Sequence, residues 1–423
     1  MNTEEQILRI MHQEIQPSLG CTEPVSVAYA CAILKENLES EIQEITLFVS
    51  ANLAKNAMAV TIPKTNVCGL KFAAALGYLC GQSSLQLEVL KHITQDDIEN
   101  AKEMLNAIHI HIKENVPNLY IEAIGRDKTN TVRIIIQQDH TYVLLLEKNQ
   151  EILIQNPPIN EEDSMKVFDS LSLKDIYDFA CCIEEDKIAF IAESAVLNTR
   201  LSEEGLKKSY GLGLTKTFQK YIDNKLLNND LSTQILMQTT AASDARMGGA
   251  PFPAMTNSGS GNQGITATIP VVVVAKHLDK ENELNRALFL SHLIAVYIHS
   301  KLPRLSALCA VTTAGIGSYA GIAWLFSKDF EVVSMGICNM IGDISGILCD
   351  GAGKSCTMKV SSTVQSAFKS LLLALEKKRV SGMDGIVDDE VDKSIQNLCS
   401  IASKSMSAVD KQILEIMLAK NSQ

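Results

Sequence analysis

The chain has 423 residues, which at about 100–200 residues per domain predicts two or three domains with a large core. Hydrophobic residues make up 46% and charged residues 21%, the proportions of a globular protein and not of a disordered one. The net charge of −11 leaves no overall positive field, and aromatic residues are only 5%. The composition therefore predicts neither nucleic acid nor an anionic membrane as a partner.

The cysteines predict a reducing compartment. The segment from Met1 to Gln6 has no basic stretch followed by an apolar run, which argues against a signal peptide. Without such a signal, eleven cysteines scattered along a chain of this length are expected to be free thiols or metal ligands, not disulfides. We therefore expect a cytoplasmic protein.

Residues 1–40 predict two helices. An apolar stripe at helical spacing marks the first, and a turn at Gln16–Gly20 follows it. The second is expected to begin at Thr22, whose hydroxyl can cap it, with Pro24 in its first turn.

Residues 41–165 predict an α+β domain. Runs of β-branched and apolar residues indicate five strands, at residues 42–49, 108–112, 119–123, 132–136 and 142–146. Several alternate with period two and are joined by short polar turns, which predicts an antiparallel meander. Helices are expected near residues 69–80 and 95–106, and the proline-containing segment 156–160 is expected to be a linker.

From residue 166 to 423 the strand pattern disappears, which predicts an all-α domain of closely packed helices. The stretch from Leu305 to Ser327 carries no charge and is long enough to span a bilayer. Its many small residues favour instead a helix buried within the helical domain. The predicted class is α+β, with a mostly helical domain and a smaller antiparallel α+β domain.

A thiol lies where the second helix is expected to begin. The free N–H groups and the dipole at a helix N-terminus stabilise a thiolate, so we expect a lowered pKa for Cys21. The alternative is a small apolar side chain in a turn, because free cysteines are commonly just buried.

A Gly-rich turn, Ser258 to Gly264, precedes a helical run. Such a turn presents backbone N–H groups to an anion, and we favour a carboxylate site over a plain flexible loop. The spacing does not match a P-loop, and no strong strand precedes the turn as a dinucleotide fingerprint requires.

Two further clusters stand out. Cys349 and Cys356 flank another Gly-rich turn, and Cys309 lies upstream. Three converging thiolates suit an iron–sulfur cluster or zinc, although unrelated core cysteines are an equal alternative on spacing alone. The second cluster, Asn52 to Met58, combines two amides with an ammonium after a strand. It indicates either a solvated turn or polar groups that face a substrate.

Together these segments resemble the L-cysteine desulfidases, a family related to the α chain of iron–sulfur L-serine dehydratases. The resemblance covers nearly the whole chain, in the family's order. The residues that carry it are Ser18–Pro24, Asn52–Met58, Asp244–Gly249, Asn257–Ile265, Cys309 and Cys349–Cys356. One departure is Gly353, where the family pattern has Lys, and it leaves the charge of that loop open.

The resemblance implies a 4Fe–4S cluster on Cys309, Cys349 and Cys356, with one iron free for substrate. The implied reaction is a β-elimination, independent of pyridoxal phosphate, that converts L-cysteine to pyruvate, ammonia and hydrogen sulfide. Cys21 is implied as a catalytic base or a fourth ligand. We expect the base, because a fourth cysteine would fill the open iron. The N-terminal helices, residues 1–40, are then expected to pack on the catalytic domain, residues 166–423.

The same resemblance assigns the substrate-binding residues. The turn is expected to hold the substrate carboxylate, and polar groups from the smaller domain are expected to complete the pocket across the domain boundary. The full set is Thr22, Glu23, Asn52, Lys55, Asn56, Ser258, Gly259, Ser260, Gly261 and Asn262.

Two alternatives stay open. One is a lyase of the L-serine dehydratase kind, which uses the same cluster on a hydroxyl group. The other is a non-catalytic binding protein or small-molecule sensor. The sequence also leaves open whether the chain forms a homo-oligomer.

Overall fold

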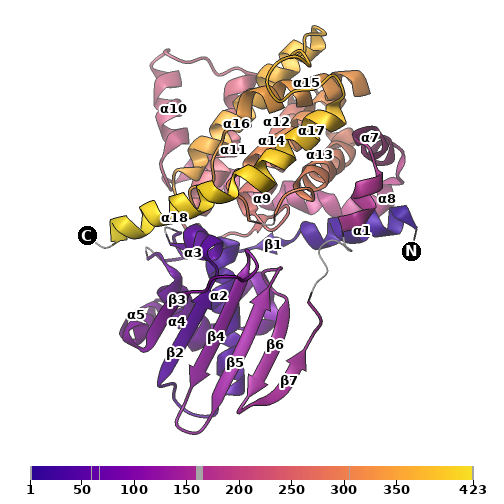
Figure 1. Ribbon diagram of the computed structural model, residues 1–423. Helices are drawn as coiled ribbons and strands as arrows, with labels where there is room; N and C mark the ends of the chain where they lie inside the picture. Colours follow the sequence, from indigo (N-terminus) through magenta and orange to yellow (C-terminus); the bar gives the residue numbers. More distant parts are fainter. Residues whose placement is uncertain (1, 59, 66, 159–164, 304, 422–423) are drawn as a thin grey trace.

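A computed structural model describes residues 2–58, 60–65, 67–158, 165–303 and 305–421. The predicted linker at residues 156–160 lies partly outside these ranges. A body of helices lies against a smaller layer in which one sheet is covered by helices (Figure 1). The α+β class is therefore confirmed.

The elements follow the chain in three groups. The first helices are α1 (Thr3–Glu14), α2 (Thr22–Asn37), α3 (Ala51–Ala57), α4 (Leu70–Cys80) and α5 (Gln95–Met104). The strands are β1 (Pro17–Ser18), β2 (Glu44–Val49), β3 (Ile108–Ile112), β4 (Tyr120–Arg126), β5 (Thr131–Gln137), β6 (Val143–Lys148), β7 (Glu151–Gln155) and β8 (Ala254–Met255). The remaining helices are α7 (Leu173–Cys182), α8 (Glu185–Ile188), α9 (Ala192–Lys207), α10 (Leu214–Asp223), α11 (Leu231–Met247), α12 (Gly261–His277), α13 (Leu284–His299), α14 (Val311–Ser327), α15 (Phe330–Ile344), α16 (Cys356–Leu375), α17 (Val391–Ser400) and α18 (Ser407–Asn421).

The main sheet has the strand order β3-β2-β4-β5-β6-β7. All five predicted strands are present, and β7 adds an edge strand that the sequence analysis did not predict. The predicted antiparallel meander is wrong at one edge, because β2 and β3 pair in parallel. The chain between them forms α3, α4 and α5, a connection long enough for a parallel crossover.

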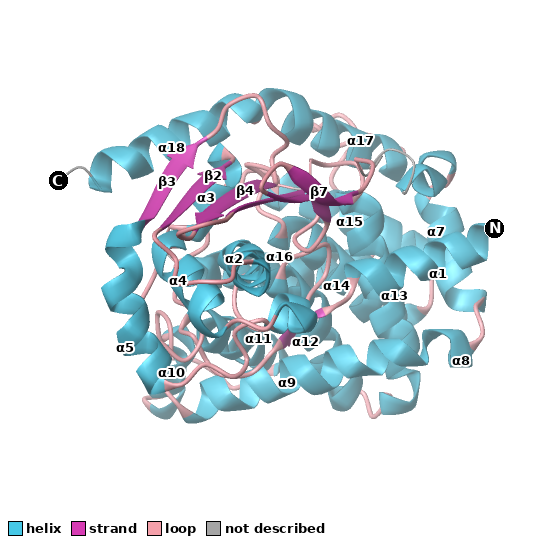
Figure 2. Ribbon diagram, turned by 90° about the horizontal axis from the view of Figure 1, so that it is seen from below, coloured by secondary structure: helices cyan, strands magenta, loops and turns pink. Residues whose placement is uncertain are grey.

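The N-terminal helices belong to two different cores. Ile7, Ile10 and Met11 of α1 pack in the core of the helical body. Helix α2 differs from the prediction, because it packs with α4 on one face of the sheet and contributes to the core there (Figure 2). Residues on both sides of α2 are buried, which an amphipathic stripe could not have indicated. The predicted cap also shifts: Cys21, not Thr22, is the N-cap residue.

Helix α14 lies at the centre of the helical body, between α12, α13 and α16. Its buried residues include Ile316 and Tyr319, which confirms the prediction of a helix surrounded by protein. Among the described residues, no helix is long and apolar enough to cross a membrane.

A short strand pair joins the two layers and positions the N-terminus of α2. Strand β1 pairs antiparallel with β8, so that Pro17 lies opposite Met255 and Ser18 opposite Ala254. Because β1 leads into α2 and β8 leads into α12, this pairing brings the starts of both helices side by side.

Candidate active site

The loops that hold Cys309 and Cys349 are joined by backbone hydrogen bonds. The N–H of Cys309 donates to the carbonyl of Ile347 (2.9 Å), and the N–H of Cys349 donates to the carbonyl of Ala307 (2.7 Å). This antiparallel bridge between the segment before α14 and the segment after α15 places the two thiols next to each other.

Cys356 reaches the same place from the first residue of α16. The N–H of Gly353 points at its sulfur (3.4 Å), and the thiol lies 3.8 Å from the carbonyl of Gly351. Gly351 has φ +95°, and a Cβ there would lie 2.5 Å from the carbonyl oxygen of Lys55. The turn between the two cysteines therefore needs glycine to pack against α3.

The ammonium groups of two lysines lie near these thiols. Lys55 of α3 donates to the carbonyl of Cys349 (3.0 Å), and Lys359 of α16 pairs with Asp350. The hydrogen bond from Cys309, together with these charges, lowers the pKa of Cys349 to about 6, whereas the contact with Cys349 raises that of Cys309. Burial raises the pKa of Cys356. Although position 353 lacks the expected Lys, Lys359 supplies a positive charge beside this loop.

The candidate metal ligands at this site are the thiols of Cys309, Cys349 and Cys356. Among the described residues, no three His, Cys, Asp or Glu side chains are arranged to hold a single metal ion. An iron–sulfur cluster distributes its cysteine ligands over several irons and is tuned by hydrogen bonds to sulfur. Three thiols with a backbone N–H aimed at one sulfur and two nearby ammonium groups fit such a cluster better than they fit one ion.

Cys21 lies in contact with this group from the opposite layer. Its side chain is 2% exposed and packs with Met247 and Cys356, at 3.9 Å from the sulfur of Met247. The expected lowering of its pKa is wrong: burial raises the pKa of Cys21 to about 12, although the nearby Arg246 acts in the other direction. The loss of hydration outweighs the benefit of the helix N-terminus.

Helix α3 connects the start of α2 with the cysteine loops. The amide of Asn56 donates to Glu23 (3.0 Å), and its oxygen lies 3.8 Å from the sulfur of Cys349. Lys55 is 1% exposed and forms an ion pair with Asp410 of α18 (2.6 Å). Ser50 at the end of β2 caps this helix, so the sheet itself fixes where α3 begins.

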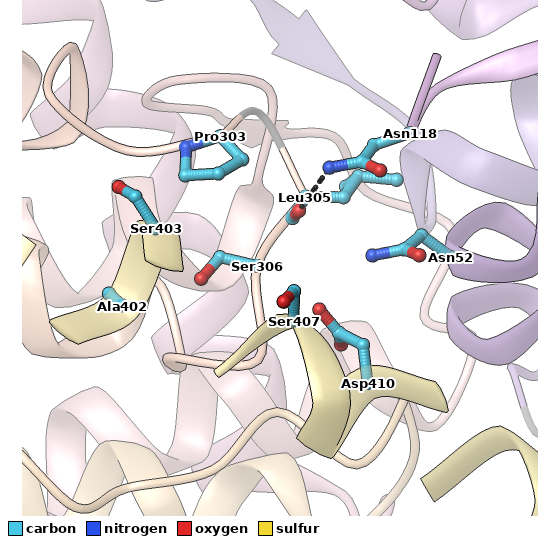
Figure 3. A pocket seen from close by; sticks show the side chains of 9 residues that line it. All are labelled: Asn52, Asn118, Pro303, Leu305, Ser306, Ala402, Ser403, Ser407 and Asp410. Carbon is cyan, nitrogen blue, oxygen red and sulfur yellow. Dashed lines mark hydrogen bonds between the residues drawn. The ribbon is translucent and has the colours of Figure 1, made fainter. Parts of the chain in front are cut away.

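Asn52 is not grouped with the other predicted site residues. It lines a separate cavity of about 140 Å³ between the two layers, together with Asn118, Ser306, Ser407 and Asp410 (Figure 3). Asn52 lies one helical turn before Lys55 and Asn56 and therefore on the same side of α3, but nearer the start of the helix. Asp410, the ion-pair partner of Lys55, lines the same cavity as Asn52.

The Gly-rich turn is held between α2 and α12. The hydroxyl of Thr22 donates to the carbonyl of Gly259 (2.8 Å), and Ser260 caps α12 by accepting the N–H of Gln263. Ser258 has φ +48° and Gly259 +78°, a tight left-handed turn. Ser258 and Gly259 also line a cavity of about 950 Å³ between the two layers.

A buried network of hydrogen bonds lies next to this turn. Asn257 donates to His292 (3.1 Å), and the other ring nitrogen of His292 lies 3.0 Å from Thr268. Burial lowers the pKa of His292 to about 3, so its ring is neutral. Sequence analysis gave His292 no role, and no signal could have found it, because a single His within an apolar helix usually fills a core.

The end of α11 also reaches the site. Asp244 accepts the N–H groups of Leu212 and Leu214 and the hydroxyl of Thr357, which ties α16 to α11. Arg246 and Met247 contact Cys21. The segment Asp244–Gly249 contributed to the family resemblance, but none of its residues was included in the predicted site.

The fold and the site define a protein with a helical body in which three thiols and a buried fourth meet at the junction with a smaller α+β layer. A family model described as serine dehydratase alpha chain matches residues 84–415, and the chain belongs to this family. The matched range includes the three cysteine loops and the Gly-rich turn, whereas Cys21 and α3 precede it.

Full-length relatives extend the similarity to the N-terminus. A UPF0597 protein of Actinobacillus pleuropneumoniae serotype 3 is 52% identical over 421 residues, covering 99% of this chain and 98% of the relative. A UPF0597 protein of Dichelobacter nodosus is 49% identical over 422 residues, with 99% and 98% covered. The UPF0597 protein YhaM of Salmonella enteritidis PT4 is 47% identical over 418 residues, with 97% and 96% covered.

Proposed function

We propose that the protein is an iron–sulfur L-cysteine desulfidase, which converts L-cysteine and water to pyruvate, ammonia and hydrogen sulfide without pyridoxal phosphate. The observation that carries the proposal is the meeting of Cys309, Cys349 and Cys356 at one place, with Cys21 beside them. Membership of the serine dehydratase alpha chain family supports a lyase reaction.

Cys309, Cys349 and Cys356 would hold a 4Fe–4S cluster. When bound, the cluster supplies a Lewis acid for the leaving sulfur, and iron suits a thiol substrate. Backbone N–H groups of the Gly351–Gly353 turn and the two lysines offset the negative charge of the thiolates.

In this proposal the thiolate form of Cys21 accepts the α-proton of the substrate at its sulfur. The nearby guanidinium of Arg246, which lowers the pKa of Cys21 against the effect of burial, favours this deprotonated form. The electron pair of the C–H bond forms the new double bond as the C–S bond breaks, and the sulfur leaves as sulfide. The aminoacrylate released in this way tautomerises to an imine, which water hydrolyses to pyruvate and ammonia. The position of Cys21 supports the role, because it faces Cys356 from a separate helix and can contact a substrate held between them.

Polar groups around Cys21 would bind the amino acid. The turn Ser258–Asn262 is proposed to hold the carboxylate at the N-terminus of α12. Glu23, which accepts a hydrogen bond from Asn56, is proposed to attract the substrate ammonium. The reducing cytoplasm is the proposed compartment, because a cluster on open thiols needs one.

L-serine dehydration is the second candidate, and the description of the matching family favours it. Anaerobically reconstituted protein should be assayed with L-cysteine and with L-serine, measuring sulfide and pyruvate. The proposal requires sulfide and pyruvate in equal amounts from L-cysteine, with L-serine much slower. Faster turnover of L-serine would favour the second candidate, and a protein inactive on both would favour a binding or sensor role.

The ligand assignment has a matched control within the chain. Cys309→Ser, Cys349→Ser and Cys356→Ser should each lose iron and the visible absorbance of the cluster. Cys338 is also buried but lies in α15, where its thiol contacts Ser394. Cys338→Ser should keep the iron content, and full iron retention in one of the first three variants would remove that residue from the ligand set.

A further inference from the structure

Arg246 is a buried cation without a carboxylate partner among the described residues. Its side chain is 6% exposed, and no ion pair joins it to an acid within the part of the chain that the structure describes. One Nη donates to the carbonyl of Gly20 (3.0 Å), while Nε is buried with no acceptor. A buried charge is costly unless it is paired, so this guanidinium is poorly compensated by the protein alone.

Three donors converge on one weak acceptor beside it. The sulfur of Met247 lies 3.5 Å from Nη1 of Arg246, 3.3 Å from Nδ2 of Asn262 and 3.9 Å from the thiol of Cys21. A thioether accepts hydrogen bonds only weakly. Donors gathered in this way indicate a place for a stronger acceptor, such as an anion.

The N-terminus of α12 adds to the positive potential at this place. A Cβ on Gly261, the first residue of this helix, would lie 2.2 Å from Nε of Arg246. The guanidinium therefore lies directly against the first turn, where the helix dipole and free N–H groups favour an anion.

The nearest acids are occupied elsewhere. Asp244 is held by two backbone N–H groups and the hydroxyl of Thr357, and Glu23 accepts a hydrogen bond from the amide of Asn56. Neither is in an ion pair with Arg246 among the described residues, which leaves the guanidinium available to a negatively charged ligand.

We infer that Arg246 and Asn262, at the first turn of α12, bind the α-carboxylate of the amino acid, and that Arg246 restricts the enzyme to substrates that have this carboxylate. The identity of the amino acid rests on the proposed function. A guanidinium can bind both oxygens of a carboxylate at once, which also orients it. Because Cys21 contacts the same guanidinium, a carboxylate held there places the adjacent α-carbon near its sulfur.

The test measures binding without turnover. L-alanine has the carboxylate and the ammonium but no leaving group, and ethylamine lacks the carboxylate. Calorimetric titration of the iron-free full chain should show L-alanine binding that weakens at least about 30-fold in Arg246→Gln, the low end for truncating one partner of a buried charge pair. The ethylamine affinity should stay unchanged.

The matched control is Arg286, an arginine of α13 that is 14% exposed and paired with Glu185. Arg286→Gln should keep the wild-type affinity for L-alanine. Asn262→Ala provides a second variant of the subsite, which should also weaken L-alanine and not ethylamine. If Arg246→Gln does not fold, the L-alanine affinity of Asn262→Ala tests the carboxylate subsite in its place.

The outcomes separate this inference from the proposed function. If wild-type protein releases no sulfide from L-cysteine but its L-alanine binding depends on Arg246, the subsite stands and the desulfidase proposal fails. If the wild type releases sulfide while Arg246→Gln, or Asn262→Ala in its place, keeps the KM for L-cysteine and the affinity for L-alanine, the subsite is overturned. Failure of the wild type to bind L-alanine would also overturn it.

Discussion

The ion pair between Lys55 and Asp410 links α3 in the smaller layer to α18 at the end of the chain, directly behind Cys349. The Lys55 ammonium is 1% exposed, and its two acceptors are Asp410 (2.6 Å) and the carbonyl of Cys349 (3.0 Å). Asp410→Ala removes the only carboxylate partner that the described residues provide. Breaking a buried ion pair costs about 3–5 kcal/mol, because it leaves one charge buried without compensation. Asp410 is 13% exposed, so water can reach the gap, and we expect about 3 kcal/mol.

Urea unfolding followed by the fluorescence of Trp324, the one tryptophan, reports on the helical body. Asp178→Ala is the control, because it breaks a pair with Lys174 whose side chains are 51% and 52% exposed. Such a pair contributes at most about 0.5 kcal/mol. Replacing both partners, as in Lys55→Met with Asp410→Leu, should restore most of the stability. Equal losses in Asp410→Ala and Asp178→Ala, or no recovery in the double variant, would refute the reasoning.

Three further predictions concern the site and its support. Cys21→Ser, purified without oxygen, should keep its iron while turnover falls at least about 10²-fold, as for a lost general base; loss of iron would make Cys21 a ligand instead. Gly264→Ala should destabilise by about 1–3 kcal/mol or more, because its Cβ would lie 1.9 Å from the carbonyl oxygen of Met255, whereas Gly346→Ala has no neighbour within 4 Å and should be neutral in the same urea assay. Because the folded pKa of His292 is about 3, below its unfolded value, its contribution to stability is complete above about pH 6.5 and is lost as the pH falls toward 3, by up to about 1.4 kcal/mol per unit. His292→Gln should reduce that slope between pH 7 and 5, and an unchanged slope would contradict the assignment.

Local patterns predicted the elements well and their arrangement less well. The strands and helices of residues 41–165 have strong periodicity, and all of the predicted ones are present. The parallel pairing of β2 with β3 depends on how α3 to α5 cross the sheet, and no alternation within a strand encodes that. The packing of α2 was missed for a related reason: a helix buried on every side has no stripe that indicates its partner.

The site shows the same division between local chemistry and tertiary context. Sequence analysis could predict the thiols, the Gly-rich turn and the Lys55–Asn56 pair as site residues. Their residue types indicate specific chemistry: metal ligation, anion binding and polar contacts with a substrate. The pKa of Cys21 could not be predicted, because the N-terminus of α2 is covered by Met247 and Cys356, which are distant in the sequence, and burial outweighs the dipole. Arg246 was missed for the converse reason. An arginine in a sequence is usually a solvated charge, and only the folded chain shows that this one is enclosed with no acid beside it among the described residues. A buried charge without a partner can be recognised only in the folded protein. Here that charge is Arg246, and its lack of an acidic partner within the described part of the chain is the reason for assigning it to the substrate carboxylate.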